Sequence, residues 1–318
     1  MFYKLFSRKQ KFVLLKIFGL FSVIRGYNIW LIAIAQYLSA IFILAPNKGA
    51  LSVLTNFNFF IIVFASLLCI AAGYIINSFY DTKKDLINRP KKTMIDRLVS
   101  QKTKLNVYFS LNFFAVFISF LISWKATLFF SSYIFLLWFY SHKLKKFPII
   151  GNLSAAILAI LPFFAILVYY NSIPELLLNI NHYKFKLIFF HAFYLFLILF
   201  IREIIKDLEN FKGDFVNDYN TIPVKYGVRI SKALIVFFTF LTIIPIYYLV
   251  TQYNVGYMDA YFYFSLLLLI YFLLKLYNAK EKSSYLKLHA LLKLIIVLGV
   301  FSIILIKPEV LSAFNKLF

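Results

Sequence analysis

Long apolar segments alternate with short polar segments along nearly the whole chain. Nine of the apolar runs approach the roughly 20 residues that an α-helix needs to cross a bilayer. The pattern predicts an all-α polytopic membrane protein in which about nine transmembrane helices form one bundle, with residues 1–318 as a single domain. The expected spans cover approximately residues 27–45, 57–78, 105–123, 126–142, 149–170, 186–206, 230–250, 258–277 and 286–306.

Two local features modify this layout. Pro162 and Pro245 fall inside expected spans, and each predicts a kink because proline lacks a backbone N–H and clashes with the preceding turn. Residues 1–24 combine basic residues with a broken apolar pattern. That combination predicts an amphipathic lead-in helix on the cytoplasmic membrane surface.

Composition supports the membrane assignment. Hydrophobic residues make up 63% of the chain and charged residues only 14%. A soluble domain of this length could not hide so much apolar surface from water. We therefore expect a multi-pass integral membrane protein, with a bacterial inner membrane as its location. The pattern does not indicate an oligomeric state.

The distribution of lysine and arginine predicts the orientation. If the amino terminus is cytoplasmic, 27 of the 34 basic residues fall on the cytoplasmic side and six on the other. This ratio fits the positive-inside rule, and with nine spans it places the carboxyl terminus outside. Because the net charge of +22 lies mostly in short loops, we expect it to meet anionic membrane lipid rather than nucleic acid.

A polar stretch follows the second expected span, where a helix would leave the membrane. Asn77, Asp81 and Asp85 lie at i, i+4 and i+8, so a continuing helix would present all three on one stripe. Their oxygen atoms suit Mg2+, a hard cation that in turn binds diphosphate. Arg89, one turn further on, could bind the same anion.

A second polar stretch follows the sixth expected span. Asp207, Asn210 and Asp214 lie near one face of the expected helix, with Arg202 and Lys206 just before them. Both stretches follow even-numbered spans, so the predicted topology places them on the same membrane face. We therefore expect their acidic and amide groups to form one Mg2+ site.

Further polar side chains are expected on that face, at the start of the first span and after the fourth. Together with the cations above, they could bind the oxygens of a diphosphate. The spans behind this polar mouth are rich in Phe, Leu and Ile and offer a lining for a lipid-soluble tail, so the combination predicts an enzyme that acts on a prenyl diphosphate. The additional candidate residues are Arg25, Asn28, Tyr140, Ser141, Lys143 and Lys145.

Less specific interpretations explain parts of this pattern. Asp81 and Asp85 could simply pair with nearby lysines at a solvated helix end. A transporter or lipid-binding protein with an intramembrane polar site is the alternative from another function class. The gathering of polar residues on one face favours the enzyme, because a transporter usually places its polar site near the membrane midplane.

The chain resembles the UbiA superfamily of intramembrane prenyltransferases from about residue 20 to residue 306. The second signature of that family contains an Asp-x-x-x-Asp core in a longer run, which is similar to the segment 202–214 here. The first signature is Asn-Asp-x-x-Asp-x-x-x-Asp followed by Asn-Arg-Pro, and it stands here as Asn77-Ser78-x-x-Asp81-x-x-x-Asp85 and Asn88-Arg89-Pro90.

The resemblance implies a nine-helix fold, a cytoplasmic active site and Mg2+-dependent prenyl transfer with release of diphosphate. It also implies that the four aspartates of the two signatures carry the catalysis. The run from Arg202 to Glu209 looks similar to the branch that alkylates a glycerol-phosphate prenyl ether, which would make a hydroxyl group the acceptor. An aromatic quinone precursor remains an open alternative. The implied catalytic residues are Asp81, Asp85, Asp207 and Asp214, and the implied metal ligands add Asn77 and Asn210.

The chain departs from both signatures. Ser78 stands where the first signature has its leading Asp, and Asn210 replaces the first Asp of the second core. Each change removes one negative charge from the expected metal site, and hydroxyl and amide oxygens bind Mg2+ more weakly than carboxylates do. These departures are the argument for a non-catalytic or lipid-binding paralogue with a weakened metal site.

Overall fold

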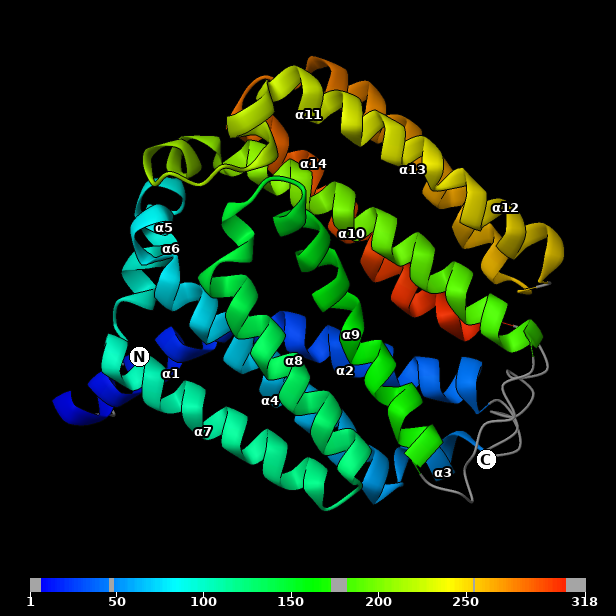
Figure 1. Cartoon of the computed structure of the whole chain (residues 1–318), viewed down its shortest axis with the longest axis horizontal. Helices are drawn as coiled ribbons and strands as arrows, with labels where there is room; N and C mark the ends of the chain where they lie inside the picture. The colour runs from blue at the N-terminus through cyan, green and yellow to red at the C-terminus, as the bar shows by residue number, and fades with distance from the viewer. Residues whose placement is uncertain (1–6, 46–48, 173–181, 254, 307–318) are drawn as a thin grey trace.

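The computed structural model describes residues 7–45, 49–172, 182–253 and 255–306, and this part of the chain is almost entirely helical (Figure 1). No β-strand occurs within the described ranges; only an isolated bridge joins Gly256 and Ile306. In chain order the elements are α1 (Arg8–Ile24), α2 (Gly26–Ser39), η2 (Ala40–Leu44), α3 (Ala50–Leu54), α4 (Phe57–Tyr80), α5 (Thr82–Asn88), α6 (Pro90–Asp96), α7 (Gln101–Phe120), α8 (Trp124–His142), η3 (Leu144–Lys146), α9 (Ile150–Ser172), α10 (His182–Val216), α11 (Ile222–Leu241), α12 (Ile243–Gln252), α13 (Met258–Asn278), α14 (Lys282–Ser302) and η5 (Ile303–Leu305).

Eight helical segments of the described chain are long and apolar enough to cross a membrane. They correspond to eight of the nine expected spans, with α11 and α12 together forming one of them. The remaining expected span, residues 126–142, is present as α8, which packs against α4, α7 and α9. Helix α8 is not among the eight apolar segments because Lys125 and several Ser, Trp and Tyr residues lower its mean hydropathy. The all-α polytopic architecture is confirmed, while the single domain and the orientation stay predictions.

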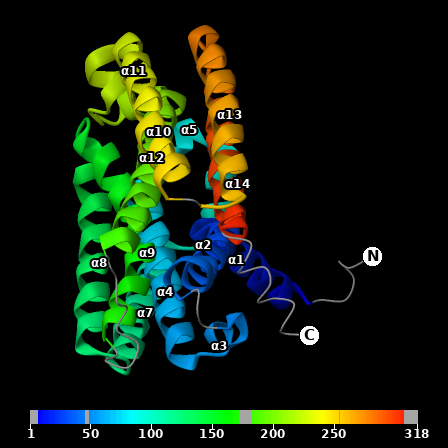
Figure 2. The ribbon, with the colours of Figure 1, turned by 90° about the vertical axis from the view of Figure 1, so that its right-hand side faces the viewer.

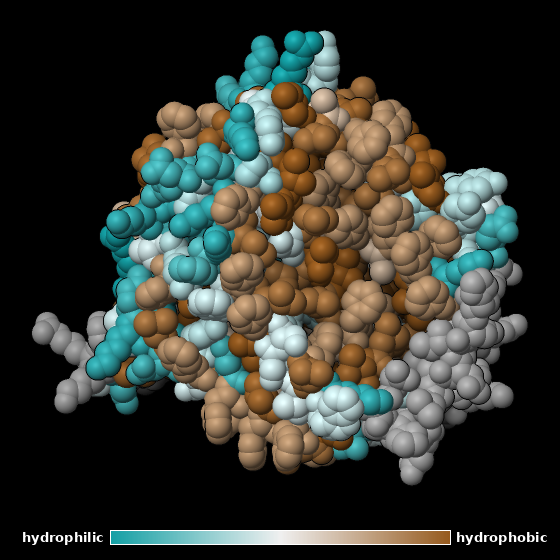
Figure 3. All heavy atoms as spheres, in the orientation of Figure 1, coloured by the Kyte–Doolittle hydropathy of each residue, from teal (hydrophilic) through white to brown (hydrophobic). Residues whose placement is uncertain are grey.

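The outer surface suits a lipid environment. Figure 3 shows a broad hydrophobic surface across the middle of the molecule, with hydrophilic residues gathered on the side where α5 and α6 lie. Phe113 of α7 and Leu274 of α13 are 67% and 65% exposed. Side chains of this kind would aggregate in water but are stable against hydrocarbon. Figure 2 shows the long helices standing alongside one another.

The lead-in helix predicted for residues 1–24 is present as α1. Val23 is buried in a small apolar cluster with Ile75 and Ile76 of α4, whereas Phe18 and Phe21 remain exposed. One side of α1 therefore packs on the bundle and another side presents apolar residues outward. This arrangement fits a helix that lies at a membrane surface.

The two prolines inside expected spans are accommodated differently. The helix α9 continues through Pro162, and the carbonyl of Leu158, which proline cannot bond, accepts a hydrogen bond from the Tyr133 hydroxyl of α8 at 3.1 Å. In contrast, the span that contains Pro245 is divided at Thr242 into α11 and α12. The hydroxyl that α8 donates to the free carbonyl therefore helps α9 to continue through its proline.

The polar stretch after the second span is helical but interrupted. Helix α4 ends at Tyr80, and α5 begins at Thr82. The Asp81 N–H still bonds the Asn77 carbonyl at 2.9 Å, and the Asp85 N–H bonds the Asp81 carbonyl at 2.8 Å. The i, i+4 register therefore survives the interruption, and the three side chains stay on the stripe that the sequence predicts.

Helix α5 is held against α10 by a close contact between Asn88 and Gly213. The Gly213 backbone N–H donates to the Asn88 side-chain oxygen at 3.0 Å. A Cβ atom built at Gly213 would lie only 2.3 Å from the Asn88 side-chain nitrogen. The carbonyl of Asn88 also accepts a hydrogen bond from Lys282 of α14. Because Gly213 has no side chain, α5 can approach α10 closely, and this brings the two polar stretches together.

Replacing Gly213 with alanine tests this contact. We expect Gly213→Ala to destabilise the protein by about 1–3 kcal/mol, the usual cost of overpacking, and to lower the apparent melting temperature in detergent by several degrees. Gly49→Ala is the control, because nothing lies within 4 Å of a Cβ atom there. Equal melting temperatures for the two variants would contradict the proposed role of Gly213.

Candidate active site

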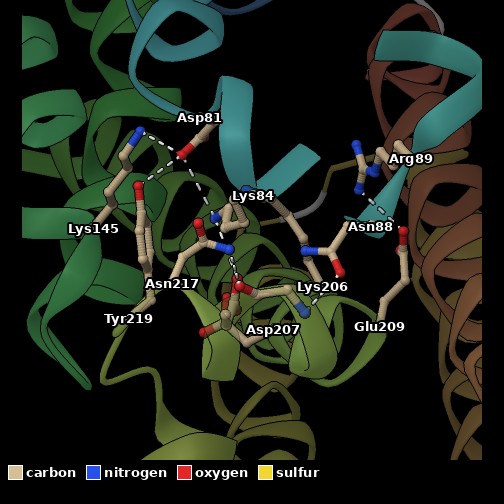
Figure 4. Close-up of polar contacts among 12 residues, drawn as sticks. Asp81, Lys84, Asn88, Arg89, Lys145, Lys206, Asp207, Glu209, Asn217 and Tyr219 are labelled. Carbon is tan, nitrogen blue, oxygen red and sulfur yellow. Dashed lines mark hydrogen bonds and ion pairs between the residues drawn. The ribbon is translucent and has the colours of Figure 1, made fainter. Parts of the chain in front are cut away.

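A polar pocket opens where the end of α4, α5, the end of α8, the start of α9 and α10 converge. Figure 4 shows several of its side chains pointing toward one another from separate helices. Most of the residues that the sequence singled out are brought together here. The pocket is lined by Arg25, Asn77, Asp81, Lys84, Asp85, Arg89, Tyr140, Lys145, Gly151, Asn152, Glu203, Lys206, Asp207, Asn210 and Thr221.

Asp81 has the most contacts in this pocket. One of its carboxylate oxygens, Oδ1, accepts from the Lys145 ammonium at 2.8 Å and from the Tyr219 hydroxyl at 3.0 Å. Lys145 also donates to the Asn77 side-chain oxygen at 3.1 Å. The side chain of Asp81 is buried, so these donors replace the water that a carboxylate would otherwise require. Segments from α4, η3 and the chain after α10 therefore meet at one oxygen atom.

Lys84 joins the two polar stretches. Its ammonium lies 3.7 Å from Asp81 and 3.3 Å from Asp214, which is nearly completely buried on α10. The same ammonium lies 4.3 Å from the centre of the Tyr219 ring, within range of a cation–π contact. A single lysine thus compensates carboxylates from both signatures.

The electrostatics follow from this crowding. Burial by itself would raise the pKa of Asp81, but the ammonium groups of Lys84 and Lys145 outweigh it and hold that pKa well below its usual range. Burial likewise opposes the charge on Lys84, yet Asp81 and Asp214 raise its pKa above the ordinary value. Lys145 is different, since burial prevails over Asp81 and lowers its pKa to about 8.

The carboxylate of Asp85 is less strongly compensated by cations than that of Asp81. Burial and then the neighbouring Asp81 carboxylate raise its pKa, against the opposing influence of Lys84 and Arg89. Its side chain is half-buried and lines the pocket. An additional cation that enters the pocket would therefore stabilise the charged form of Asp85.

The α10 side of the pocket contains several buried oxygen atoms with few partners. Asp207 accepts from the Asn152 side-chain nitrogen at 2.7 Å. Asp214 has the Lys84 ammonium 3.3 Å from its Oδ1, whereas Asn210 Oδ1 accepts no hydrogen bond within the described chain. A buried oxygen usually has a partner, so the Asn210 oxygen indicates a place for a ligand or a hard cation.

The arrangement of oxygens limits how a metal ion could be held. Among the described residues, no group of three or more Asp, Glu, His or Cys side chains is placed to bind a metal ion. Mg2+ commonly binds through one or two carboxylates, keeps several waters and takes the rest of its oxygens from a phosphate substrate. The oxygen atoms of Asp81, Asp85, Asp207 and the two asparagines fit that mode of binding.

Arg25 reaches the pocket from the junction of α1 and α2. Its backbone lies in the left-handed region, with φ of 52°, which is uncommon outside glycine. Its guanidinium lies 5.0 Å from the centre of the Tyr74 ring, and Asn28 donates to the Tyr74 hydroxyl at 3.2 Å. Asn28 does not line the pocket, so Tyr74 connects it to Arg25.

Four further predicted residues also lie outside the pocket lining. Ser141 is buried although it follows the pocket residue Tyr140, and Lys143 is exposed although it lies two positions before the pocket residue Lys145. Asp214 lies behind Lys84, and Arg202 lies 3.7 Å from Glu203. Their predicted roles in binding the metal or the diphosphate stay predictions.

Several pocket residues were absent from the predicted site. Glu203 and Asn152 belong to segments that resemble the family, and Lys84 lies between two predicted aspartates, so motif position could have found them. Thr221 begins another segment that resembles the family, whereas Tyr219, which bonds Asp81 from outside the pocket lining, carries no such signal. Tyr219 follows a turn that includes Asp218 with φ of 58°, and only this turn brings its hydroxyl back to Asp81.

The departure at Ser78 has a structural counterpart. The Lys104 ammonium of α7, almost fully buried, donates to the Ser78 hydroxyl at 3.4 Å. A carboxylate at residue 78 would therefore meet a cation already present in the chain. Asn210, in contrast, points an unpaired oxygen into its buried surroundings.

The chain is similar to known proteins over most of its length. A digeranylgeranylglyceryl phosphate synthase of Thermococcus sibiricus is 33% identical over 190 residues, which are 60% of this chain and 63% of that protein. The chain thus matches less than two thirds of that relative.

Two solved structures have the same fold. One, concerned with digeranylgeranylglyceryl phosphate synthase in membranes, has a TM-score of 0.66 at 20% identity and covers 94% of this chain and 99% of its own. The other is a UbiA homologue from Archaeoglobus fulgidus bound to GPP and Mg2+, with a TM-score of 0.60 at 16% identity, covering 90% of this chain and 99% of its own. A model of the UbiA prenyltransferase family matches residues 33–295, which include both polar stretches. The chain belongs to the UbiA prenyltransferase family.

Proposed function

We propose that this protein transfers the prenyl group of a prenyl diphosphate to the hydroxyl group of a prenylated glyceryl phosphate and releases diphosphate. The observation that carries the proposal is the contact of Lys84 with Asp81 and Asp214, which joins the two polar stretches into one pocket. Oxygen ligands and cations alternate in that pocket, and a diphosphate bound with a divalent cation needs both.

The oxygen ligands have one task in this proposal. Asp81, Asp85 and Asp207, with the side-chain oxygens of Asn77 and Asn210, would hold Mg2+, and Asp214 would support them through Lys84. When bound, Mg2+ would neutralise part of the diphosphate charge and so favour its departure. Asn152 keeps Asp207 in place through its 2.7 Å hydrogen bond.

The cations have the second task. Arg25, Arg89, Lys145 and Lys206 line the pocket and would bind the remaining diphosphate oxygens, with the Tyr140 hydroxyl beside them. As the C–O bond breaks, negative charge grows on the diphosphate, so fixed cations stabilise the transition state more than the bound substrate. The acceptor oxygen then bonds to the allylic carbon as the hydroxyl gives up its proton.

The relatives support the choice of acceptor. The sequence alone leaves a glyceryl phosphate ether and an aromatic quinone precursor open. The similar protein of Thermococcus sibiricus is a digeranylgeranylglyceryl phosphate synthase, and that name describes a glyceryl phosphate that carries two geranylgeranyl groups. We therefore propose an oxygen nucleophile rather than an aromatic ring carbon.

The location of the site is part of the proposal. The predicted topology puts most lysines and arginines on the face that holds the pocket, and the positive-inside rule supports our proposal that this face is cytoplasmic. The relatives named here come from archaea, so a bacterial inner membrane stays a prediction of the sequence.

The pocket carboxylates give a direct test. We expect Asp81→Asn and Asp207→Asn each to lower kcat/KM for prenyl transfer at least about 100-fold, because each removes a charged ligand that matters most in the transition state. Asp218→Asn is the control, since this exposed residue has the left-handed backbone that asparagine tolerates. Near-normal transfer by both pocket variants, in protein that binds membranes and melts normally, would exclude the assigned site.

The two departures from the family pattern give a paired test. Asn210→Asp should lower the Mg2+ concentration for half-maximal activity several-fold, because a carboxylate replaces a buried oxygen that has no partner. Ser78→Asp should change it little, because Lys104 would neutralise the new charge. Titration of activity with Mg2+ measures both effects, and an equal response of the two variants would contradict this account of the metal site.

The acceptor and the non-catalytic alternative are tested together. Purified protein is incubated with Mg2+, labelled geranylgeranyl diphosphate and either geranylgeranylglyceryl phosphate or an aromatic quinone precursor. We expect diphosphate release and a labelled ether with the first acceptor and no product with the second. Tight binding of the prenyl diphosphate without any release would instead favour a lipid-binding protein, as the weakened signatures would allow.

A further inference from the structure

A second polar cluster lies between α10 and α14, beside the diphosphate pocket. Its centre is Glu209, which is almost fully buried on α10. One Glu209 oxygen accepts from Arg89 at 3.0 Å, and the other lies 2.9 Å from His289 Nδ1 of α14. The carboxylate therefore fixes both an arginine of the pocket and the orientation of the imidazole ring. None of the reaction steps proposed above uses His289.

Two nitrogen atoms in this cluster have no protein partner. His289 is 8% exposed, and its Nε2 atom makes no hydrogen bond to any described residue. The Nε atom of Arg202 is also buried and unpaired within the described chain. Buried polar atoms are nearly always hydrogen-bonded in folded proteins. Two unpaired nitrogens on facing helices therefore indicate a polar ligand between α10 and α14.

Lys293 adds a cation to the same place. It lies one helical turn after His289 on α14, on the same face and within a membrane span. The guanidinium groups of Arg25, Arg89 and Arg202 act electrostatically on its ammonium, and so does the Glu209 carboxylate. No ion pair of Lys293 is found among the described residues, and a lone cation within a membrane span usually marks a functional site.

The charges in this cluster do not balance. Its two carboxylates are Glu203, which contacts Lys206 at 2.5 Å and Arg202 at 3.7 Å, and Glu209, which contacts Arg89 at 3.0 Å. Counting Lys293 as well, four cations share these two carboxylates, besides the imidazole of His289. These cations are only partly exposed and outnumber the carboxylates, so an anionic ligand would stabilise this arrangement.

We propose that Arg202, His289 and Lys293 form a subsite for the phosphate monoester of the acceptor. This inference rests on the proposed function, which requires an acceptor with one phosphate group and one hydroxyl group. Because Nδ1 of His289 is held by Glu209, its Nε2 is left to share a proton with a phosphate oxygen. Arg202 Nε and the Lys293 ammonium donate to the other oxygens.

The position of the subsite is consistent with the reaction. Arg202, His289 and Lys293 do not line the diphosphate pocket, whereas Glu203 of the next position on α10 and Arg89 do. The two anions would thus lie on adjacent faces of α10, separated by Glu203 and Glu209. This separation keeps the acceptor phosphate away from the diphosphate while the acceptor hydroxyl extends toward the prenyl group.

The test compares acceptors with and without the phosphate group, using protein in phosphatidylcholine nanodiscs. Wild-type protein should bind geranylgeranylglyceryl phosphate much more tightly than geranylgeranylglycerol. Lys293→Gln and Arg202→Gln should each weaken binding of the phosphorylated acceptor on the order of tenfold, the usual cost of one charged hydrogen bond. Affinity for geranylgeranyl diphosphate, and for the acceptor without phosphate, should stay within about twofold.

The matched control is Lys287→Gln, which removes an exposed lysine from the same helix. It should bind both acceptors like the wild type. Equal loss of affinity for geranylgeranyl diphosphate and for the acceptor in Lys293→Gln would assign the residue to the diphosphate pocket and overturn the subsite. Unchanged binding of the phosphorylated acceptor in both cluster variants would overturn it as well.

A competition experiment tests whether the cluster binds the acceptor or ordinary membrane lipid. Phosphatidic acid carries the same phosphate monoester, and we expect it to compete with the acceptor only weakly because its acyl chains differ from one prenyl ether. Competition as strong as that of unlabelled acceptor would assign the cluster to bulk lipid instead. Because these measurements report equilibrium binding, they remain informative if no prenyl transfer is observed, an outcome that would overturn only the proposed function.

Discussion

Burial of carboxylates at a helix junction is the constraint on which the rest of this structure depends. Asp81 and Asp214 come from separate polar stretches, and each is almost completely removed from solvent. Like charges so close together are stable only if cations lie between them, and Lys84 and Lys145 take those places. The close contact between Asn88 and Gly213 then allows α5 to approach α10 closely enough for one lysine to serve both sides.

The same constraint links structure to function. An arrangement in which protein cations neutralise protein carboxylates can exchange partners when a diphosphate and a divalent cation enter, because both new groups carry the complementary charge. The two polar clusters on α10 illustrate the difference between a balanced and an unbalanced site. Around Asp81 the charges are matched within the chain, whereas between α10 and α14 the cations exceed the carboxylates. In the proposed subsite, an anion from outside the chain supplies the negative charge that the second arrangement lacks.

Departures from the family signatures are less alike than the sequence suggests. Ser78 and Asn210 both remove a negative charge, and in sequence they look equivalent. In the structure Ser78 contacts a buried lysine, so a carboxylate at residue 78 would be neutralised by that lysine, while the Asn210 oxygen has no partner. The environment of a substitution, rather than its chemistry alone, decides whether a metal site is weakened.

The sequence by itself determined the helical spans, the two polar stretches and the spacing of Asn77, Asp81 and Asp85. It could do so because an apolar span in hydrocarbon must satisfy its own backbone hydrogen bonds as a helix, and because helical periodicity is a local property. Only the tertiary structure decided that Tyr219 bonds Asp81, that Asn152 holds Asp207 and that His289 meets Glu209. These contacts join residues from 55 to 138 positions apart, and no local pattern encodes them. They arise from the packing of α10 against its neighbours, which depends on the fit of all the side chains between them.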